Sequence, residues 1–193
     1  MTIAAVVLAA GLSRRMGTPK LVLPWGKTTI IRHVVEVLSE SGLDEILVVT
    51  GGAHAQVTAA LHGTAAQLAF NADFEKGEML SSIQVGLRCL PEYASAALVC
   101  LGDQPQIQAE VVRAVIDLHR TTGKQLVVPS YHNRRGHPWL ASHSFWAEVL
   151  ALPQTTNPRQ YINSYTGRIE YVQADESILQ DLDTPEDYNN QHP

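Results

Sequence analysis

Short apolar runs rich in β-branched residues alternate with stretches of helical periodicity along the chain. The first strand is expected from Ile3 to Leu8, and Ile31, Val34, Val35 and Leu38 then recur at the spacing of one helix face. Such alternation is typical of βαβ units, which build a mostly parallel sheet covered by helices. The pattern therefore predicts an α/β protein with three layers, α/β/α.

The same pattern continues to the end of the sequence. No internal repeat, low-complexity tract or long linker interrupts it, so residues 1–193 are expected to form a single domain. Ligands of such sheets bind at the carboxyl ends of the strands, which points to the loops after Leu8, Phe70 and Leu101. Further strands are expected at 46–50, 67–70, 96–101, 126–129, 138–141 and 168–172, and further helices at 53–61, 80–90, 107–120 and 144–150, with a last helix opened by Pro185.

Composition narrows the classes of partner. The formal net charge of -5 argues against a broad basic surface for nucleic acid. The longest apolar run, Ile3 to Ala10, is far shorter than the roughly 20 residues of a membrane span. We therefore expect a cytoplasmic protein that binds neither nucleic acid nor membrane. Cys89 and Cys100 stand in apolar surroundings and are expected to be buried free thiols, and the spacing of the histidines argues against a zinc site.

The segment from Gly11 to Lys20, directly after the first strand, has the composition of a phosphate-binding loop. Small residues let backbone N–H groups approach phosphate oxygens, and its three cationic side chains neutralise charge. Its glycines do not fit the GxGxxG dinucleotide motif, and Gly26-Lys27-Thr28 completes only the end of a Walker loop. The alternative is a basic surface turn whose arginines are merely solvated.

The string AAGLSRRMGTPK, residues 9–20, resembles the signature of the nucleotidyltransferases related to molybdenum cofactor cytidylyltransferase and guanylyltransferase, roughly [AG]-[AG]-G-x-S-x-R-M-G-x-x-K. The resemblance implies a Rossmann-like nucleotidyltransferase fold whose glycine-rich loop wraps a nucleoside triphosphate. It also implies that Arg15 and Lys20 contact the phosphates and act in catalysis together with Asp103. The nucleotide-binding residues implied in this way are Leu8, Ala9, Ala10, Gly11, Ser13, Arg14, Arg15, Lys20, Ser82 and Asp103.

Two acidic segments are candidates for holding Mg²⁺, which prefers oxygen ligands and is commonly bound by one or two carboxylates plus phosphates. Asp103 follows a buried strand in the string GDQP, although a turn-forming role before Pro105 is the alternative. Asp183 precedes Thr-Pro, where helix capping would explain part of the pattern. Both strings resemble metal motifs of the family, which implies Asp103 and Asp183 as metal ligands, with Asp181 in reserve.

Two further segments are assigned by resemblance. Ser82 occupies the position that lies beside the nucleotide base in the related fold, although Ser81 and Ser82 could simply cap a helix. Arg135 and His137, in the string RGHP, correspond to a segment near the acceptor. They could bind an acceptor phosphate, or His137 could contact its ring system; solvated turn residues are the alternative.

These assignments predict a Mg²⁺-dependent nucleotidyltransferase that moves CMP from CTP to a phosphorylated small-molecule acceptor and releases pyrophosphate. CTP is favoured because Ala9-Ala10-Gly11 is closer to the cytidylyl type than to the Gly-Gly of guanylyl-transferring relatives. The acceptor that the resemblance implies is molybdopterin. Two alternatives stay open: an enzyme of the same fold that uses GTP or another phosphorylated acceptor, and a nucleotide-binding module without turnover.

Overall fold

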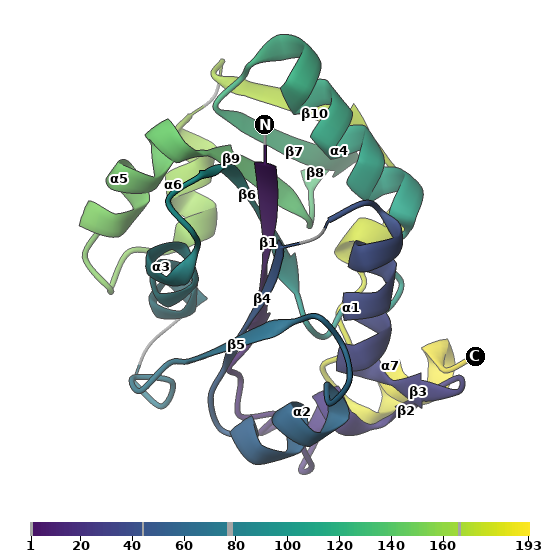
Figure 1. The fold of residues 1–193 in the computed structure, drawn as a ribbon. Coiled ribbons are helices and arrows are strands. Elements are labelled where there is room, and N and C mark those ends of the chain that lie inside the picture. The colour runs from purple at the N-terminus through teal and green to yellow at the C-terminus, as the bar shows by residue number, and fades with distance from the viewer. Residues whose placement is uncertain (1, 44, 77–78, 166) are drawn as a thin grey trace.

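The computed structural model describes residues 2–43, 45–76, 79–165 and 167–193. An eight-stranded sheet runs through its middle in the order β10-β7-β9-β6-β1-β4-β5, with β8 paired to β7 (Figure 1). Its strands are β1 (Thr2–Ala9), β4 (Glu45–Thr50), β5 (Gln67–Phe70), β6 (Ala94–Leu101), β7 (Leu126–Tyr131), β8 (Arg134–Arg135), β9 (Trp139–Ser142) and β10 (Ile169–Gln173).

The sheet is mostly parallel, as the alternating pattern predicts. β1 pairs in parallel with β4 and β6, β4 with β5, and β7 with β10. β9 is antiparallel to both β6 and β7. The carboxyl ends of β1, β4, β5 and β6 therefore meet at one edge of the sheet, where ligands of such sheets bind.

Helices cover both faces of the sheet (Figure 1). One face carries α1, α4 and α7, and the other carries α3, α5 and α6. Residues of β1 alternate between the two cores: Ala5 and Val7 belong to the core under α1 and α4, and Val6 belongs to the core under α3 and α5. The helices are α1 (Ile30–Glu40), α2 (His54–Ala60), α3 (Met79–Cys89), α4 (Ala109–Thr122), α5 (His143–Ala151), α6 (Pro158–Ser164) and α7 (Pro185–Gln191).

A continuous apolar strand such as β1 is what a sheet buried on both faces requires. Side chains of a strand alternate in direction, so both sets must be apolar when both faces are covered. This explains why strict polar-apolar alternation is missing from the sequence of β1. Helices on both faces of the sheet confirm the predicted three-layer α/β/α architecture.

The structure adds short elements that the sequence patterns did not indicate. A hairpin of β2 (Pro24–Trp25) and β3 (Thr28–Thr29) precedes α1, and its turn holds Gly26 and Lys27 of the incomplete Walker string. The 3-10 turns η1 (Lys20–Val22) and η2 (Glu176–Leu179) are also new, as are β8 and α6. α6 escaped notice because it has only seven residues and follows the polar stretch 154–157.

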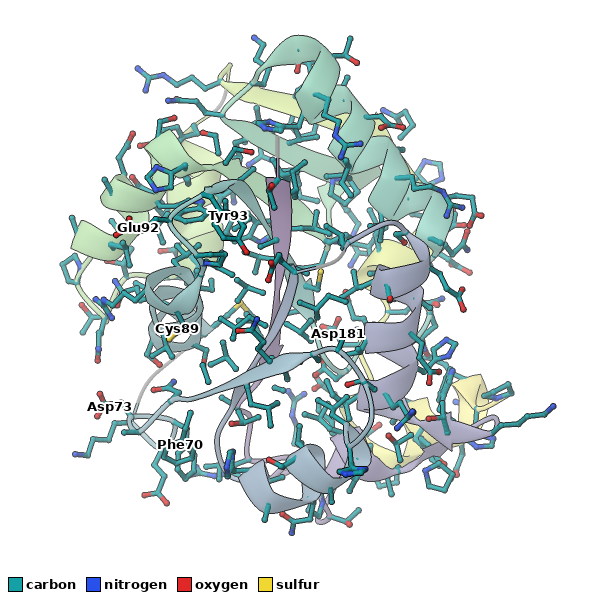
Figure 2. All side chains as sticks on the ribbon, in the orientation of Figure 1. Phe70, Asp73, Cys89, Glu92, Tyr93 and Asp181 are labelled. Carbon is teal, nitrogen blue, oxygen red and sulfur yellow. The ribbon has the colours of Figure 1, made fainter. Side chains whose placement is uncertain are left out.

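The expectation of two buried thiols is half wrong. Cys100 is buried in β6, but Cys89 is exposed at the end of α3, where Figure 2 labels it. In the last turn of α3, Gly86 and Leu87 are buried against the sheet while Arg88 and Cys89 are exposed, so apolar sequence neighbours did not imply burial of Cys89. In the described part of the chain, no helix combines the length and hydropathy of a membrane span.

Candidate functional site

The loop after β1 is closed by its own backbone. The carbonyl oxygen of Ser13 accepts from the N–H groups of Met16 at 3.0 Å and Gly17 at 3.1 Å. The Lys20 N–H donates to the Ser13 hydroxyl oxygen at 3.2 Å. Ser13 itself has a φ of 50°, a left-handed conformation that is uncommon for residues other than glycine. Ser13 thus fixes both the turn and the start of the segment that carries Lys20.

A pocket of about 220 Å³, called here the loop pocket, lies between this loop and the start of α2. Three of the residues predicted to bind nucleotide line it: Gly11, Ser13 and Arg14. Ala9 and Ala10 are buried at the end of β1 and just beyond it, where they support the loop. The complete lining is Gly11, Leu12, Ser13, Arg14, Gly17, Thr18, Pro19, Gly52 and Ala53.

Four predicted residues meet in one ion-pair cluster. The Lys20 Nζ lies 2.5 Å from Asp103 Oδ2 and 3.0 Å from Asp183 Oδ1. The other oxygen of Asp183 is 2.8 Å from Arg15 Nη2. The chain therefore brings together residues 163 positions apart in sequence, as Lys20 and Asp183 are.

The environment of Lys20 keeps it charged. Its side chain is only 11% exposed, and burial by itself would lower the pKa of the amine. The charges and hydrogen bonds of Asp103 and Asp183 outweigh that effect and raise the pKa above its usual value. The cluster is thus a largely buried ammonium shared by two carboxylates.

Two backbone arrangements place the carboxylates of the cluster. The Leu182 N–H donates to the carbonyl oxygen of Asp103 at 3.1 Å, and the Leu182 side chain is fully buried. Asp183 is followed by the capping box of α7, in which Thr184 Oγ1 accepts from the Asp187 N–H and Asp187 Oδ2 accepts from the Thr184 N–H. The helix start expected at Pro185 is confirmed, and it fixes the chain next to Asp183.

Asp181 has surroundings that differ from those of Asp183. Its carboxylate accepts a hydrogen bond from the Gln104 side chain, whose amide also donates to the Ile178 carbonyl oxygen at 3.5 Å. Desolvation by the surrounding protein raises the pKa of Asp181, and the nearby charge of Asp103 adds to the effect. Figure 2 shows Asp181 near the middle of the molecule.

A second cavity of about 290 Å³, called here the α6 cavity, lies beside Asp181. Arg135 and His137 both line it. The Arg135 guanidinium donates to Asn163 Oδ1 at 2.5 Å and to the Tyr171 hydroxyl, and its carbon lies 5.3 Å from the Tyr171 ring centroid. The complete lining is Met79, Leu101, Gln104, Val128, Arg134, Arg135, Gly136, His137, Trp139, Pro158, Ile162, Asn163, Ile178, Leu179 and Asp181.

Steric crowding explains why position 136, in the RGHP segment, is a glycine. A Cβ atom on Gly136 would overlap the carbonyl oxygen and Cβ of Ile178. The His137 N–H donates to that same carbonyl oxygen at 3.1 Å. RGHP is therefore clamped against η2, the turn that leads to Asp181 and Asp183.

Ser82 lies at the buried start of α3. Asn71 Nδ2 donates to Ser81 Oγ at 2.9 Å and to Ser82 Oγ at 3.0 Å, and all three side chains are buried. Asn71 directly follows β5, so the end of this strand and the first turn of α3 are joined at the edge of the sheet. Ser82 does not line the loop pocket, and its assignment to the nucleotide base stays a prediction.

Sequence reasoning overlooked Gln104 and Asn71 as parts of the site. A signal existed for each: Gln104 lies within the string GDQP, and Asn71 is the first residue after a predicted strand. Among the described residues, no group of three His, Cys, Asp or Glu side chains could hold a metal ion. The assignment of Asp103 and Asp183, with Asp181 in reserve, to a metal ion stays a prediction.

Comparisons with known proteins identify the family of the chain. A family model described as a MobA-like NTP transferase domain matches residues 5–169. The molybdenum cofactor cytidylyltransferase of Escherichia coli strain K12 is 28% identical, over 95% of this chain and 92% of that protein. The purine catabolism protein PucB of Bacillus subtilis strain 168 is 30% identical, over 95% of this chain and 93% of that protein.

Solved structures match over nearly the full length. The crystal structure of Rv0371c from Mycobacterium tuberculosis H37Rv has a TM-score of 0.87 at 28% identity and covers 98% of this chain and 97% of that chain. A structure of Rv0371C in complex with manganese has a TM-score of 0.81 at 27% identity, covering 100% of this chain and 98% of that chain. The expected nucleotidyltransferase fold is confirmed.

Proposed function

Because the chain belongs to the family of MobA-like NTP transferase domains, we propose that it transfers CMP from CTP to a phosphorylated acceptor, molybdopterin, and releases pyrophosphate. The observation that carries the proposal is the ion-pair cluster of Arg15, Lys20, Asp103 and Asp183, which lies where a glycine-rich loop meets the carboxyl end of β6. The proposal assigns residues 1–193 to one nucleotidyltransferase domain.

The residues of the cluster fit a divalent cation. One ammonium, that of Lys20, lies within 3.0 Å of oxygens from both Asp103 and Asp183, so the two carboxylates are close enough to share a cation. Carboxylate oxygens are the ligands that Mg²⁺ prefers, and it takes its remaining ligands from water and substrate phosphates. Asp103 and Asp183 would hold Mg²⁺, with Asp181 in reserve. Manganese in the structure of Rv0371C supports a divalent cation in this family.

The chain's own contribution to such a reaction is positioning and neutralisation of charge. A bound Mg²⁺ would supply Lewis-acid stabilisation of phosphate charge. Arg15 and Lys20 offer cationic hydrogen-bond donors to the triphosphate. The backbone N–H groups of the Gly11–Ser13 segment offer uncharged donors. The acceptor phosphate oxygen attacks the α-phosphorus of CTP, the bond to the β-phosphate bridging oxygen breaks, and pyrophosphate leaves. An ionised phosphate needs no protein nucleophile or base, so alignment is the main requirement.

The choice of CTP rests on the loop and on one relative. The loop carries Ala9-Ala10-Gly11, which resembles cytidylyl-transferring members more than the Gly-Gly of guanylyl-transferring ones. The molybdenum cofactor cytidylyltransferase of Escherichia coli aligns over 95% of the chain. Leu8, Ala9, Ala10, Gly11, Ser13, Arg14 and Ser82 are the residues that we assign to the nucleoside and its phosphates.

The acceptor is assigned to the α6 cavity. Its walls combine apolar side chains such as Trp139 and Ile162 with the cationic Arg135 and with His137. Such a cavity suits a ring system that carries a phosphate, because apolar walls bury the rings and a guanidinium binds phosphate by two parallel donors. Arg135 and His137 are the acceptor-binding residues of the proposal.

Thermal stabilisation tests the nucleotide part of this proposal. A ligand that binds only the folded protein raises its melting temperature by mass action. We expect CTP with Mg²⁺ to raise Tm more than GTP with Mg²⁺, and each nucleotide to act less strongly with EDTA. Equal shifts for CTP and GTP would contradict the cytidine assignment, and shifts that ignore Mg²⁺ would contradict the metal assignment.

A further inference from the structure

The glycine-rich loop is also held from outside, at the corner between β4 and α2. Leu12 is 39% exposed and lies against Gly52, where a Cβ atom would come within 2.7 Å of Leu12 Cδ2. The same Cβ would be 3.4 Å from Phe74 Cε2. The Leu12 and Phe74 side chains therefore both lie over Gly52, which has no side chain, and we call Leu12, Gly52 and Phe74 the loop clasp.

Neither Gly51 nor Gly52 is a glycine for conformational reasons, since neither has a positive φ. A Cβ on Gly51 would lie 2.5 Å from the Ala10 carbonyl oxygen and 2.7 Å from Phe74 Cβ. Real Cβ atoms essentially never approach other atoms so closely. Gly51 is therefore required by the close approach of the backbone after β1, whereas the Cβ missing from Gly52 leaves the space in which the end of the Leu12 side chain sits.

Phe74 is itself held in place. Its N–H donates to the Asn71 carbonyl oxygen at 3.3 Å, and its ring packs edge-on against Phe70 with centroids 6.0 Å apart. Phe70 in turn packs against His54 at 5.3 Å, and His54 Nδ1 is 2.7 Å from the Thr50 hydroxyl. Figure 2 labels Phe70 at the end of β5. The clasp thus rests on a chain of contacts anchored in the sheet.

We propose that Leu12 is a positioning residue for the nucleoside triphosphate: seated on Gly52 beside Phe74, it holds the Gly11–Ser13 segment in the shape that receives the phosphates. The inference rests on the proposed function, because it takes the loop pocket as the triphosphate site. Leu12 is one of the residues lining that pocket, together with Gly52. A loop that must order itself on binding loses affinity, whereas a loop held beforehand does not.

A comparison of two leucines tests this role. Leu12→Ala removes the clasp, and Leu68→Ala on β5 removes an equally exposed leucine, 36% against 39%, away from the loop pocket. For binding of CTP with Mg²⁺, measured by calorimetry, we expect about tenfold weaker affinity for Leu12→Ala, because small misplacements of positioning groups are costly. Leu68→Ala should stay within about twofold of wild type.

A double variant separates clasping from simple loss of a side chain. Gly52→Ala puts a Cβ where the end of the Leu12 side chain sits, so that side chain must move off Gly52, and CTP binding should weaken by about tenfold, as in Leu12→Ala. In Gly52→Ala/Leu12→Ala the clashing atom is gone, so affinity should equal that of Leu12→Ala alone rather than the product of both losses. Leu12→Met, which keeps most of the apolar volume, should bind like wild type.

Two further readouts distinguish positioning from a general structural defect. KM for CTP should rise in Leu12→Ala while kcat stays within about threefold, because the residue touches no reacting atom. Amide exchange of segment 11–20 should quicken without nucleotide while Tm changes little.

Wild-type affinity in Leu12→Ala, or multiplicative losses in the double variant, would overturn the inference. Wild-type protein that binds neither CTP nor GTP would overturn the proposed function and this inference together, and that result is visible before any variant is made.

Discussion

The loop pocket is lined by Arg14 and Pro19, next to Arg15 and Lys20 in sequence, and the α6 cavity by Gln104, next to Asp103, but the two are built in different ways. Seven of the nine residues that line the loop pocket come from the single segment 11–19, and the other two are Gly52 and Ala53. The α6 cavity takes its walls from α3, β6, the RGHP segment, α6 and η2. The loop pocket is thus formed mainly by one continuous loop, whereas the α6 cavity is formed by segments that are far apart in sequence.

This difference teaches where each kind of specificity resides. Phosphates are bound by backbone N–H groups and cations, which one short loop supplies. An acceptor must be distinguished by shape, which takes side chains from several elements. Under the proposed function, the loop pocket would bind the triphosphate that the family shares, and the α6 cavity would select this chain's acceptor.

The largest expected effect is the loss of turnover when a carboxylate of the ion-pair cluster is removed. Asp103→Ala removes a proposed metal ligand and should lower kcat by about 10²- to 10³-fold, a loss typical of removing one group that stabilises transition-state charge. Tm should fall by only a few degrees, because the Lys20 ammonium keeps its second partner, Asp183. Pyrophosphate release measures the first quantity. Turnover within tenfold of wild type would remove Asp103 from the metal site.

A smaller effect is expected on the side of the loop pocket. Lys20→Met should weaken CTP binding by about 10- to 100-fold, the value of a hydrogen bond to a charged group. It should also lower the free energy of unfolding in EDTA, because the carboxylates of Asp103 and Asp183 lose their ammonium.

The pH dependence of that stability has a definite sign. Since the folded pKa of Lys20 is raised above 10.5, its contribution is fully present below pH 10.5 and is lost as the pH rises through the raised pKa. The difference in unfolding free energy between wild type and Lys20→Met should therefore be constant near neutral pH and shrink above pH 10.5. A difference that grows in that range would contradict the assigned ion pairs.

The smallest effect is expected on the side of the α6 cavity and should leave the nucleotide untouched. Arg135→Ala should raise KM for the acceptor about tenfold through loss of a guanidinium–phosphate contact, with the affinity for CTP unchanged. Arg120→Ala, which removes an exposed arginine from α4, serves as the control. Equal changes for nucleotide and acceptor would mean that the two pockets are not separate in function.

The sequence predicted the fold well because its signals are local and strong. Buried parallel strands appear as apolar runs, and the start of α7 was indicated by Thr184 ahead of Pro185, with a side chain at position 187 completing the capping box. α6 was missed because seven residues give too little periodicity. Cys89 is exposed because it lies on the outer side of the last turn of α3, whose inner side is formed by the buried Gly86 and Leu87.

Because sequence signals are local, they predicted which residues belong to the candidate site better than they predicted the contacts among them. The motifs identified Lys20, Asp103 and Asp183 as separate elements, but nothing in the sequence showed that one ammonium contacts both carboxylates. The hydrogen bond from Gln104 to Asp181 and the position of Leu12 over Gly52 both depend on segments that are far apart in sequence. Resemblance supplies residue roles, whereas distances and partners come only from the folded chain.

The most direct test of the central claim is the reaction itself. Purified protein, CTP, Mg²⁺ and molybdopterin should yield pyrophosphate and a CMP-linked acceptor, detected together by mass spectrometry. GTP in place of CTP, or EDTA in place of Mg²⁺, should give little product. Pyrophosphate formation that is equal with CTP and GTP, or absent with molybdopterin but present with another phosphorylated acceptor, would contradict the proposed substrates.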